Sequence, residues 1–62
     1  MEAEEIKATR QGLKMTQREF ADAVGVDQVS VNRWENNKKR PGRLAKKALA
    51  RMATKLKRQD NK

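Results

Sequence analysis

Apolar residues recur at helical spacing in several segments of the chain, and short polar stretches separate these segments. Alanine, leucine, lysine, arginine and glutamate dominate them, runs of β-branched residues are absent, and the single proline is Pro41. This pattern predicts an all-α fold. We expect helices over residues 3–11, from Gln17 to a turn at Gly25, over 28–36 and over 43–58.

The boundaries of the second and third predicted helices carry clear local signals. Thr16 and Glu19 have the spacing of a capping box, so the second helix begins at Gln17. Gly25 supplies the positive φ that ends it, and Asp27 is a good N-cap for the third helix. Phe20, Val24 and Val26 are expected to face inward, as are Val31 and Trp34 on the third helix.

The predicted fourth helix has an apolar side and a basic side. A step of 100° per residue places on the apolar side Leu44, Ala45, Ala48, Leu49, Met52 and Leu56. Since only three other helices are available, we expect Leu44, Leu49 and Met52 to close the core. Leu56 and Ala53 are then left for contact with a second copy of the chain.

Composition limits the chemistry of the chain. Its 62 residues suffice for a single domain, residues 1–62, with a small core. The sequence contains no cysteine and no histidine. Disulfides, thiolate metal sites and the usual general base are therefore excluded, and no catalytic pair can be proposed from the scattered carboxylates. We expect no enzyme, no metal and no cofactor.

Charge is the first positive indication of a partner. Sixteen Lys and Arg against eight Asp and Glu give a net charge of +8. Ten basic residues and no acidic one lie between Asn36 and Gln59, which indicates a binding face for a polyanion. RNA, a membrane surface or an acidic protein would satisfy this charge equally well. Without an apolar N-terminal run or a long apolar stretch, we expect a cytoplasmic, nucleoid-associated protein and no membrane partner.

The segment 17–36, QREFADAVGVDQVSVNRWEN, has the layout of a helix-turn-helix. Two helices joined by a short turn that contains glycine form this motif, and its second helix enters the major groove of DNA. Ala21 is small where the helices cross, Gly25 makes the turn, and Trp34 fills the wedge between the helices. Each residue taken alone fits a core or surface role equally well, but together these positions favour the motif.

The segment 6–41 resembles the lambda-repressor-like (Cro/C1-type) domain of phage repressors, Cro proteins, controller proteins and antitoxins. The fragments MTQREFADAVGV and VNRWENNKKRP carry the resemblance. It implies a compact bundle of four or five helices, an ion pair between Arg10 and Glu35, and a Gln17 side chain that reaches a phosphate and braces Gln28. The chain departs from the pattern at Lys14 and Asn37, where glycine is usual.

The candidate binding residues follow from the face that the third helix presents outward. Base reading is assigned to Gln28, Val29, Asn32 and Arg33, because amide, guanidinium and methyl groups suit base edges. Phosphate contact is assigned to Gln17, Arg18, Ser30, Asn37, Lys38, Lys39, Arg40 and Arg43. The structural positions of the motif are Arg10, Glu35, Ala21, Gly25 and Trp34.

These residues predict a sequence-specific double-stranded DNA-binding transcriptional regulator. We expect a repressor that binds a palindromic operator as a homodimer. The alternative is an antitoxin or another interaction module whose basic amphipathic helix, residues 43–58, binds a partner protein such as a toxin. RNA is less favoured, because no exposed aromatic side chain is expected to stack on unpaired bases.

Overall fold

The computed structural model describes residues 2–60. It contains four helices, α1 (Ala3–Gly12), α2 (Gln17–Val24), α3 (Gln28–Glu35) and α4 (Arg43–Asp60). Within residues 2–60 there is no strand, so the predicted all-α fold of four helices is confirmed. Three ends differ from the prediction: α1 includes Gly12, α3 stops at Glu35, and α4 continues to Asp60. Residues 1, 61 and 62 of the expected domain lie outside the described part.

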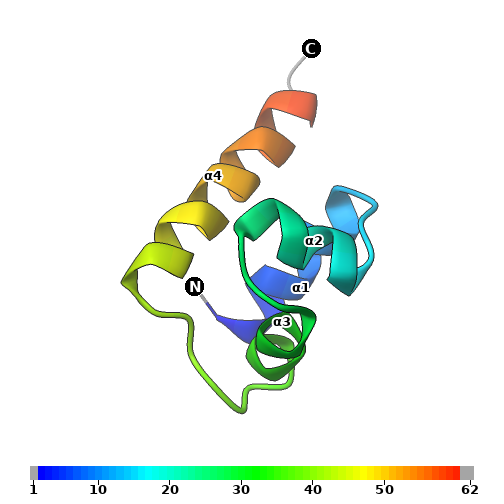
Figure 1. The fold of residues 1–62 in the computed structure, drawn as a ribbon. Helices are drawn as coiled ribbons and strands as arrows, with labels where there is room; N and C mark the ends of the chain where they lie inside the picture. Colours follow the sequence, from blue (N-terminus) through cyan, green and yellow to red (C-terminus); the bar gives the residue numbers. More distant parts are fainter. Residues whose placement is uncertain (1, 61–62) are drawn as a thin grey trace.

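The helices pack around α2 and α3, which form the helix-turn-helix. Helix α1 contacts α3 and α4, and α4 also contacts α2. Figure 1 shows that the C-terminal part of α4 extends beyond the other helices. An 18-residue helix is about 27 Å long. This length accounts for the longest dimension of the molecule, 35 Å, against 21 and 19 Å in the other directions.

Side-chain caps fix the start of α2 as predicted. The Thr16 hydroxyl accepts a hydrogen bond from the backbone N–H of Glu19 at 3.1 Å, and the Glu19 carboxylate accepts one from the backbone N–H of Thr16 at 2.9 Å. At the other end Gly25 has φ +92°. Helix α1 uses a related device that the sequence analysis did not identify, because Glu5 accepts a hydrogen bond from the backbone of Glu2 at 3.0 Å.

Within residues 2–60, two residues other than glycine adopt the left-handed conformation. Lys14, before α2, and Asn37, after α3, both have φ +59°. These are the two positions where the sequence departs from the glycines of the family that it resembles. Asparagine tolerates this conformation, whereas it costs lysine about 1 kcal/mol relative to glycine. The backbone of the fold has thus been kept at both places without the glycine.

The core is small and draws on all four helices. Its buried apolar residues are Ile6, Phe20, Ala21, Val31, Trp34, Leu49 and Met52. Ala21, on α2, is buried in this core to 1% exposure, so a larger side chain there would have to displace its neighbours. Val24 and Val26 are partly buried and pack against the edge of the core.

The predicted apolar side of α4 is wrong at its first turn. Leu44 was expected to close the core, but its exposed fraction is 80%, and Pro41, just before the helix, is buried instead. Leu56 was expected to remain free, but it is partly buried and lies against Gly12. A Cβ atom added to Gly12 would come within 2.8 Å of Leu56 Cδ2, so this glycine permits the close approach of α1 and α4.

The two leucines of α4 give a matched test of this packing. Leu49 is fully buried and Leu44 is 80% exposed. Leu49→Ala is expected to lower the free energy of unfolding by about 2–5 kcal/mol, because it removes buried methyl groups and leaves a cavity. Leu44→Ala is expected to change it by less than about 0.5 kcal/mol. Urea denaturation measures both, and similar losses in the two variants would contradict the arrangement.

Candidate nucleic-acid interface

Helix α3 divides its side chains between the core and the surface. Val31 and Trp34 have exposed fractions of 0% and 4%. The other face presents the side chains that the sequence analysis assigned to base reading, Gln28, Val29, Asn32 and Arg33. All of them are exposed, Val29 to 54%. Their predicted outward orientation is confirmed, and the face combines two amides, one guanidinium and an aliphatic group.

Asp27 caps the N-terminus of α3, as predicted. Its Oδ1 accepts hydrogen bonds from the Ser30 hydroxyl at 2.6 Å and from the Ser30 backbone N–H at 3.0 Å. The hydroxyl, then the backbone N–H, and also the charge of Arg33 lower the pKa of Asp27 below its ordinary value of 3.8. The Ser30 hydroxyl donates its hydrogen to Asp27, so it must rotate before it can donate to a phosphate.

The Arg10–Glu35 ion pair, which the resemblance implied, is present and joins α1 to α3. Arg10 Nε donates to Glu35 Oε2 at 2.7 Å, and Arg10 Nη2 donates to Glu35 Oε1 at 3.1 Å. Arg10 Nη1 also donates to the backbone oxygen of Met15 at 3.0 Å, before α2. The side chains are only 14% and 4% exposed. One largely buried guanidinium therefore ties together α1, α3 and the segment that leads into α2.

Gln17 extends this pair toward the outer face of α3. Its Nε2 donates to Glu35 Oε1 at 3.2 Å, and its Oε1 accepts from Asn32 Nδ2 at 3.4 Å. The expectation that Gln17 braces Gln28 is thus corrected, because both ends of its amide are engaged with Glu35 and Asn32. Asn36 completes the series by donating from Nδ2 to Asn32 Oδ1 at 3.2 Å and to the Asn32 backbone oxygen at 2.9 Å.

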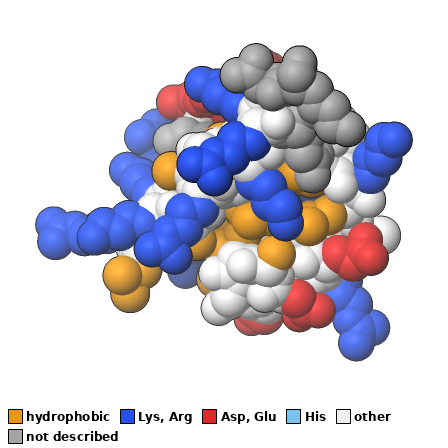
Figure 2. Space-filling view, turned by 90° about the horizontal axis from the view of Figure 1, so that it is seen from above, with side chains coloured by type: hydrophobic (Ala, Val, Ile, Leu, Met, Phe, Trp, Pro, Cys, Tyr) orange, Lys and Arg blue, Asp and Glu red, His pale blue; other side chains and the backbone are white. Residues whose placement is uncertain are grey.

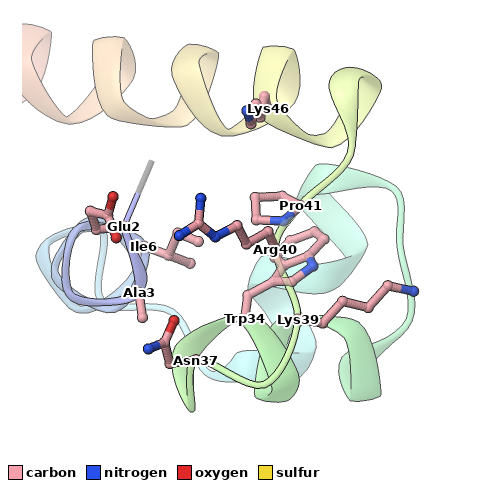
Figure 3. Close-up of a pocket in the computed structure, with 9 residues that line it drawn as sticks. All are labelled: Glu2, Ala3, Ile6, Trp34, Asn37, Lys39, Arg40, Pro41 and Lys46. Atoms are coloured by element: carbon pink, nitrogen blue, oxygen red, sulfur yellow. The ribbon is translucent and has the colours of Figure 1, made fainter.

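The basic loop after α3 does not form one cluster. Lys38, Lys39 and Arg40 are all exposed. Figure 3 shows that Lys39 points away from Trp34, whereas Arg40 points back over a small pocket toward Ile6. The pocket has a volume of about 50 Å³, well below the roughly 300 Å³ that organic ligands require. The loop therefore offers its charges in different directions.

The remaining predicted phosphate contacts lie at the ends of helices. Arg18 is exposed on the first turn of α2, Asn37 is exposed after α3, and Arg43 is exposed at the start of α4. Gln17 is half-buried between α2 and α3. Figure 2 shows Lys and Arg side chains projecting from much of the outline of the molecule, while acidic side chains appear at fewer places.

The described part of the chain gives no sign of two other kinds of site. Within residues 2–60, no three of His, Cys, Asp and Glu lie close enough together to hold a metal ion. None of the helices of this part is both long and apolar enough to cross a membrane.

Comparison with known families decides the identity of the motif. The sequence model of the family described as Helix-turn-helix matches residues 6–52. The chain belongs to this family. It is a helix-turn-helix regulator of the Cro/C1 type, and it binds DNA. No curated protein and no solved structure gives a significant match.

Asn36 also belongs to the candidate site of this helix-turn-helix regulator, although it was not predicted from the sequence. The residue was assigned only to the end of α3, yet its side chain contacts Asn32. The spacing of the two residues was an available signal, because residues four apart lie on the same side of a helix. The direction of the Gln17 side chain had no such signal, since it depends on the packing of α2 against α3.

The ion pair is open to a direct stability test. Arg10→Met is expected to lower the free energy of unfolding by about 3 kcal/mol, because it leaves the Glu35 carboxylate buried without its partner. The double variant Arg10→Met/Glu35→Met is expected to be more stable than Arg10→Met alone, since no charge stays unpaired. Urea denaturation of these variants and of Glu35→Met measures the losses in free energy of unfolding. A double variant whose loss equals the sum of the losses of Arg10→Met and Glu35→Met would contradict the expectation.

Proposed function

We propose that this helix-turn-helix regulator is a repressor that binds a palindromic operator as a homodimer, with α3 of each copy in the major groove. The observation that supports this proposal best is the division of α3 into two faces. Its outer side chains are exposed, while Val31 and Trp34 on its inner face are buried in the core. A helix presented in this way can insert its outer side chains between the phosphate backbones without losing its contact with the core.

Base reading follows from the hydrogen-bonding groups on that face. Arg33 suits guanine, whose O6 and N7 accept two hydrogen bonds from a guanidinium. Gln28 and Asn32 suit adenine, whose N7 accepts and whose N6 donates. Val29 is 54% exposed between these polar neighbours and suits the methyl group of thymine. Four such side chains at the surface of one helix can specify a short half-site.

Phosphate contacts place the helix but do not select its sequence. Arg18 and the free N–H of the Gln17 amide lie at the N-terminus of α2, where the helix dipole favours an anion. Lys38 and Lys39 supply exposed charge in the loop after α3, and Arg43 supplies it at the start of α4. Asn37, Ser30 and Arg40 are further candidates, with a rotation of the Ser30 hydroxyl and of the Arg40 side chain required for contact.

The homodimer rests on the small size of a single reading face. An eight-residue helix reaches only a few base pairs, so two copies are needed for a selective operator. In a palindromic site their recognition helices lie about 34–36 Å apart. The exposed side chain of Leu44 replaces Leu56 as the apolar group of α4 that is available to a second copy. Repression then follows from occupation of DNA that polymerase requires.

Two basic residues with different proposed roles test the function. Arg33→Ala is expected to weaken binding to an operator selected from random duplexes by about 1–3 kcal/mol more than it weakens binding to random sequence. Lys39→Ala serves as the control, since loss of a phosphate contact weakens both and lowers the slope of log affinity against log salt by about one. Fluorescence anisotropy titrations at several salt concentrations measure these quantities.

The pattern of losses decides the assignment. If Arg33→Ala weakens binding to the operator and to random sequence equally, Arg33 contacts a phosphate and does not read a base. An unchanged salt slope for Lys39→Ala would remove Lys39 from the phosphate-binding set.

A further inference from the structure

The amide side chains of Gln17, Asn32 and Asn36 form a hydrogen-bonded series that begins at the Glu35 carboxylate. Glu35 accepts hydrogen bonds from Arg10 on both carboxylate oxygens, at 2.7 and 3.1 Å. A carboxylate that serves as an acceptor toward Arg10 also requires a donor from Gln17. Gln17 therefore turns its NH₂ group to Glu35, at 3.2 Å, and its oxygen away from Glu35.

The orientation of the Gln17 amide in turn sets that of Asn32 on the recognition helix. The oxygen of Gln17 accepts from Asn32 Nδ2 at 3.4 Å, so Asn32 turns its NH₂ group to α2 and its Oδ1 toward the C-terminal end of α3. Asn36 Nδ2 donates to that Oδ1 at 3.2 Å and is itself held at 2.9 Å by the Asn32 backbone oxygen. An Asn32 amide rotated by 180° would place donor against donor at Asn36 and acceptor against acceptor at Gln17.

Asn32 retains hydrogen-bonding capacity for DNA after these contacts. Its NH₂ group has a second hydrogen, and its oxygen has a second lone pair. Because the side chain is exposed, both can meet a base edge. The donor of this pair always lies on the Gln17 side, and the acceptor always lies on the Asn36 side.

A fixed order of donor and acceptor matters in the major groove. An A·T pair presents, from the adenine side, an acceptor, a donor, an acceptor and a methyl group, and a T·A pair presents the reverse order. For a side chain held at one place in the groove, an amide of fixed direction matches the donor and acceptor order of only one orientation, whereas an amide that is free to flip can also turn its donor to O4 of the reversed pair.

We infer that Glu35, acting through Gln17, and Asn36, which is held by the Asn32 backbone oxygen, together fix the direction of the Asn32 amide and thereby make Asn32 distinguish A·T from T·A. Gln17 and Asn36 are then positioning residues that determine specificity. This inference rests on the proposed base reading by α3, but it concerns the orientation of one base pair rather than DNA binding as such.

Selection of binding sites from random duplexes, with the whole chain, tests the inference. An Asn32→Ala variant first identifies the base pair that Asn32 reads, as the position whose preference disappears. The wild-type chain is expected to select adenine on one strand there. Gln17→Met, which keeps the length of the side chain but not its amide, is expected to accept A·T and T·A alike, so that the preference between them falls by about tenfold.

Two further variants separate positioning from other roles of Gln17. Gln11→Met makes the same substitution on the exposed surface of α1 and is expected to keep the wild-type preference. Asn36→Ala leaves the Glu35 contact with Gln17 intact and is expected to reduce the A·T preference, since it frees Oδ1 of Asn32. Loss of a Gln17 contact to phosphate alone would weaken all sequences equally and leave the selected base pair unchanged.

The free protein provides a readout that does not involve DNA. In nuclear magnetic resonance spectra, hydrogen exchange of the Asn32 side-chain NH₂, which donates to Gln17, is expected to be slower than that of Asn37, which is also exposed but donates to no other side chain within residues 2–60. Gln17→Met is expected to abolish the difference.

The outcomes distinguish the inference from the proposed function. A selected motif that Gln17→Met leaves unchanged, or equal exchange at Asn32 and Asn37, overturns the inference alone. A wild-type chain that selects no motif overturns both.

Discussion

The ion pair of Arg10 and Glu35 is the interaction on which the rest of this regulator depends. It joins α1 to α3 through two short hydrogen bonds, and a third from Arg10 reaches the segment before α2. Helix α3 is also held by packing, since it contacts α1 and α2 and its Val31 and Trp34 belong to the buried core. A charged pair that is largely shielded from water holds a defined geometry, because any displacement would leave a buried charge without its partner.

The pair also connects stability to recognition. Glu35 belongs to the buried scaffold, and Asn32 belongs to the exposed face of α3, yet Gln17 contacts both. The helix that reads DNA is thus oriented by packing on one side, through Val31 and Trp34, and by a series of hydrogen bonds on the other. Binding residues held in advance lose less conformational entropy when they meet their target.

Much of the fold could be predicted from the sequence, because local chemistry determines it. The caps at Thr16 and Asp27 and the turn at Gly25 each depend on residues a few positions apart. The exposed face of α3 followed equally well from periodicity. The burial of Leu49 and the exposure of Leu44 also agree with periodicity, since residues five apart lie about 140° from one another around a helix and cannot share one narrow buried face. The prediction for Leu44 was wrong because it placed both leucines on the same side of α4. The contact of Leu56 with Gly12 could not be predicted, because it depends on how α1 packs against α4.

The proposed site was predicted residue by residue, but its connections were not. Sequence pattern identified Gln17 and Asn32 as separate contacts with DNA, whereas the structure joins their amides at 3.4 Å. Such a contact between residues 15 apart in the chain depends on how α2 crosses α3. Resemblance to relatives suggested Gln28 as the partner of Gln17, whereas the structure pairs Gln17 with Glu35 and Asn32.

The most direct test of the account is the symmetry and content of the DNA that the wild-type chain selects from random duplexes. The account predicts an enriched inverted repeat whose half-sites have centres about 10–10.5 base pairs apart or a multiple of this, each bound by one copy. Recovery of no enriched sequence, with binding that depends on salt alone, would contradict it.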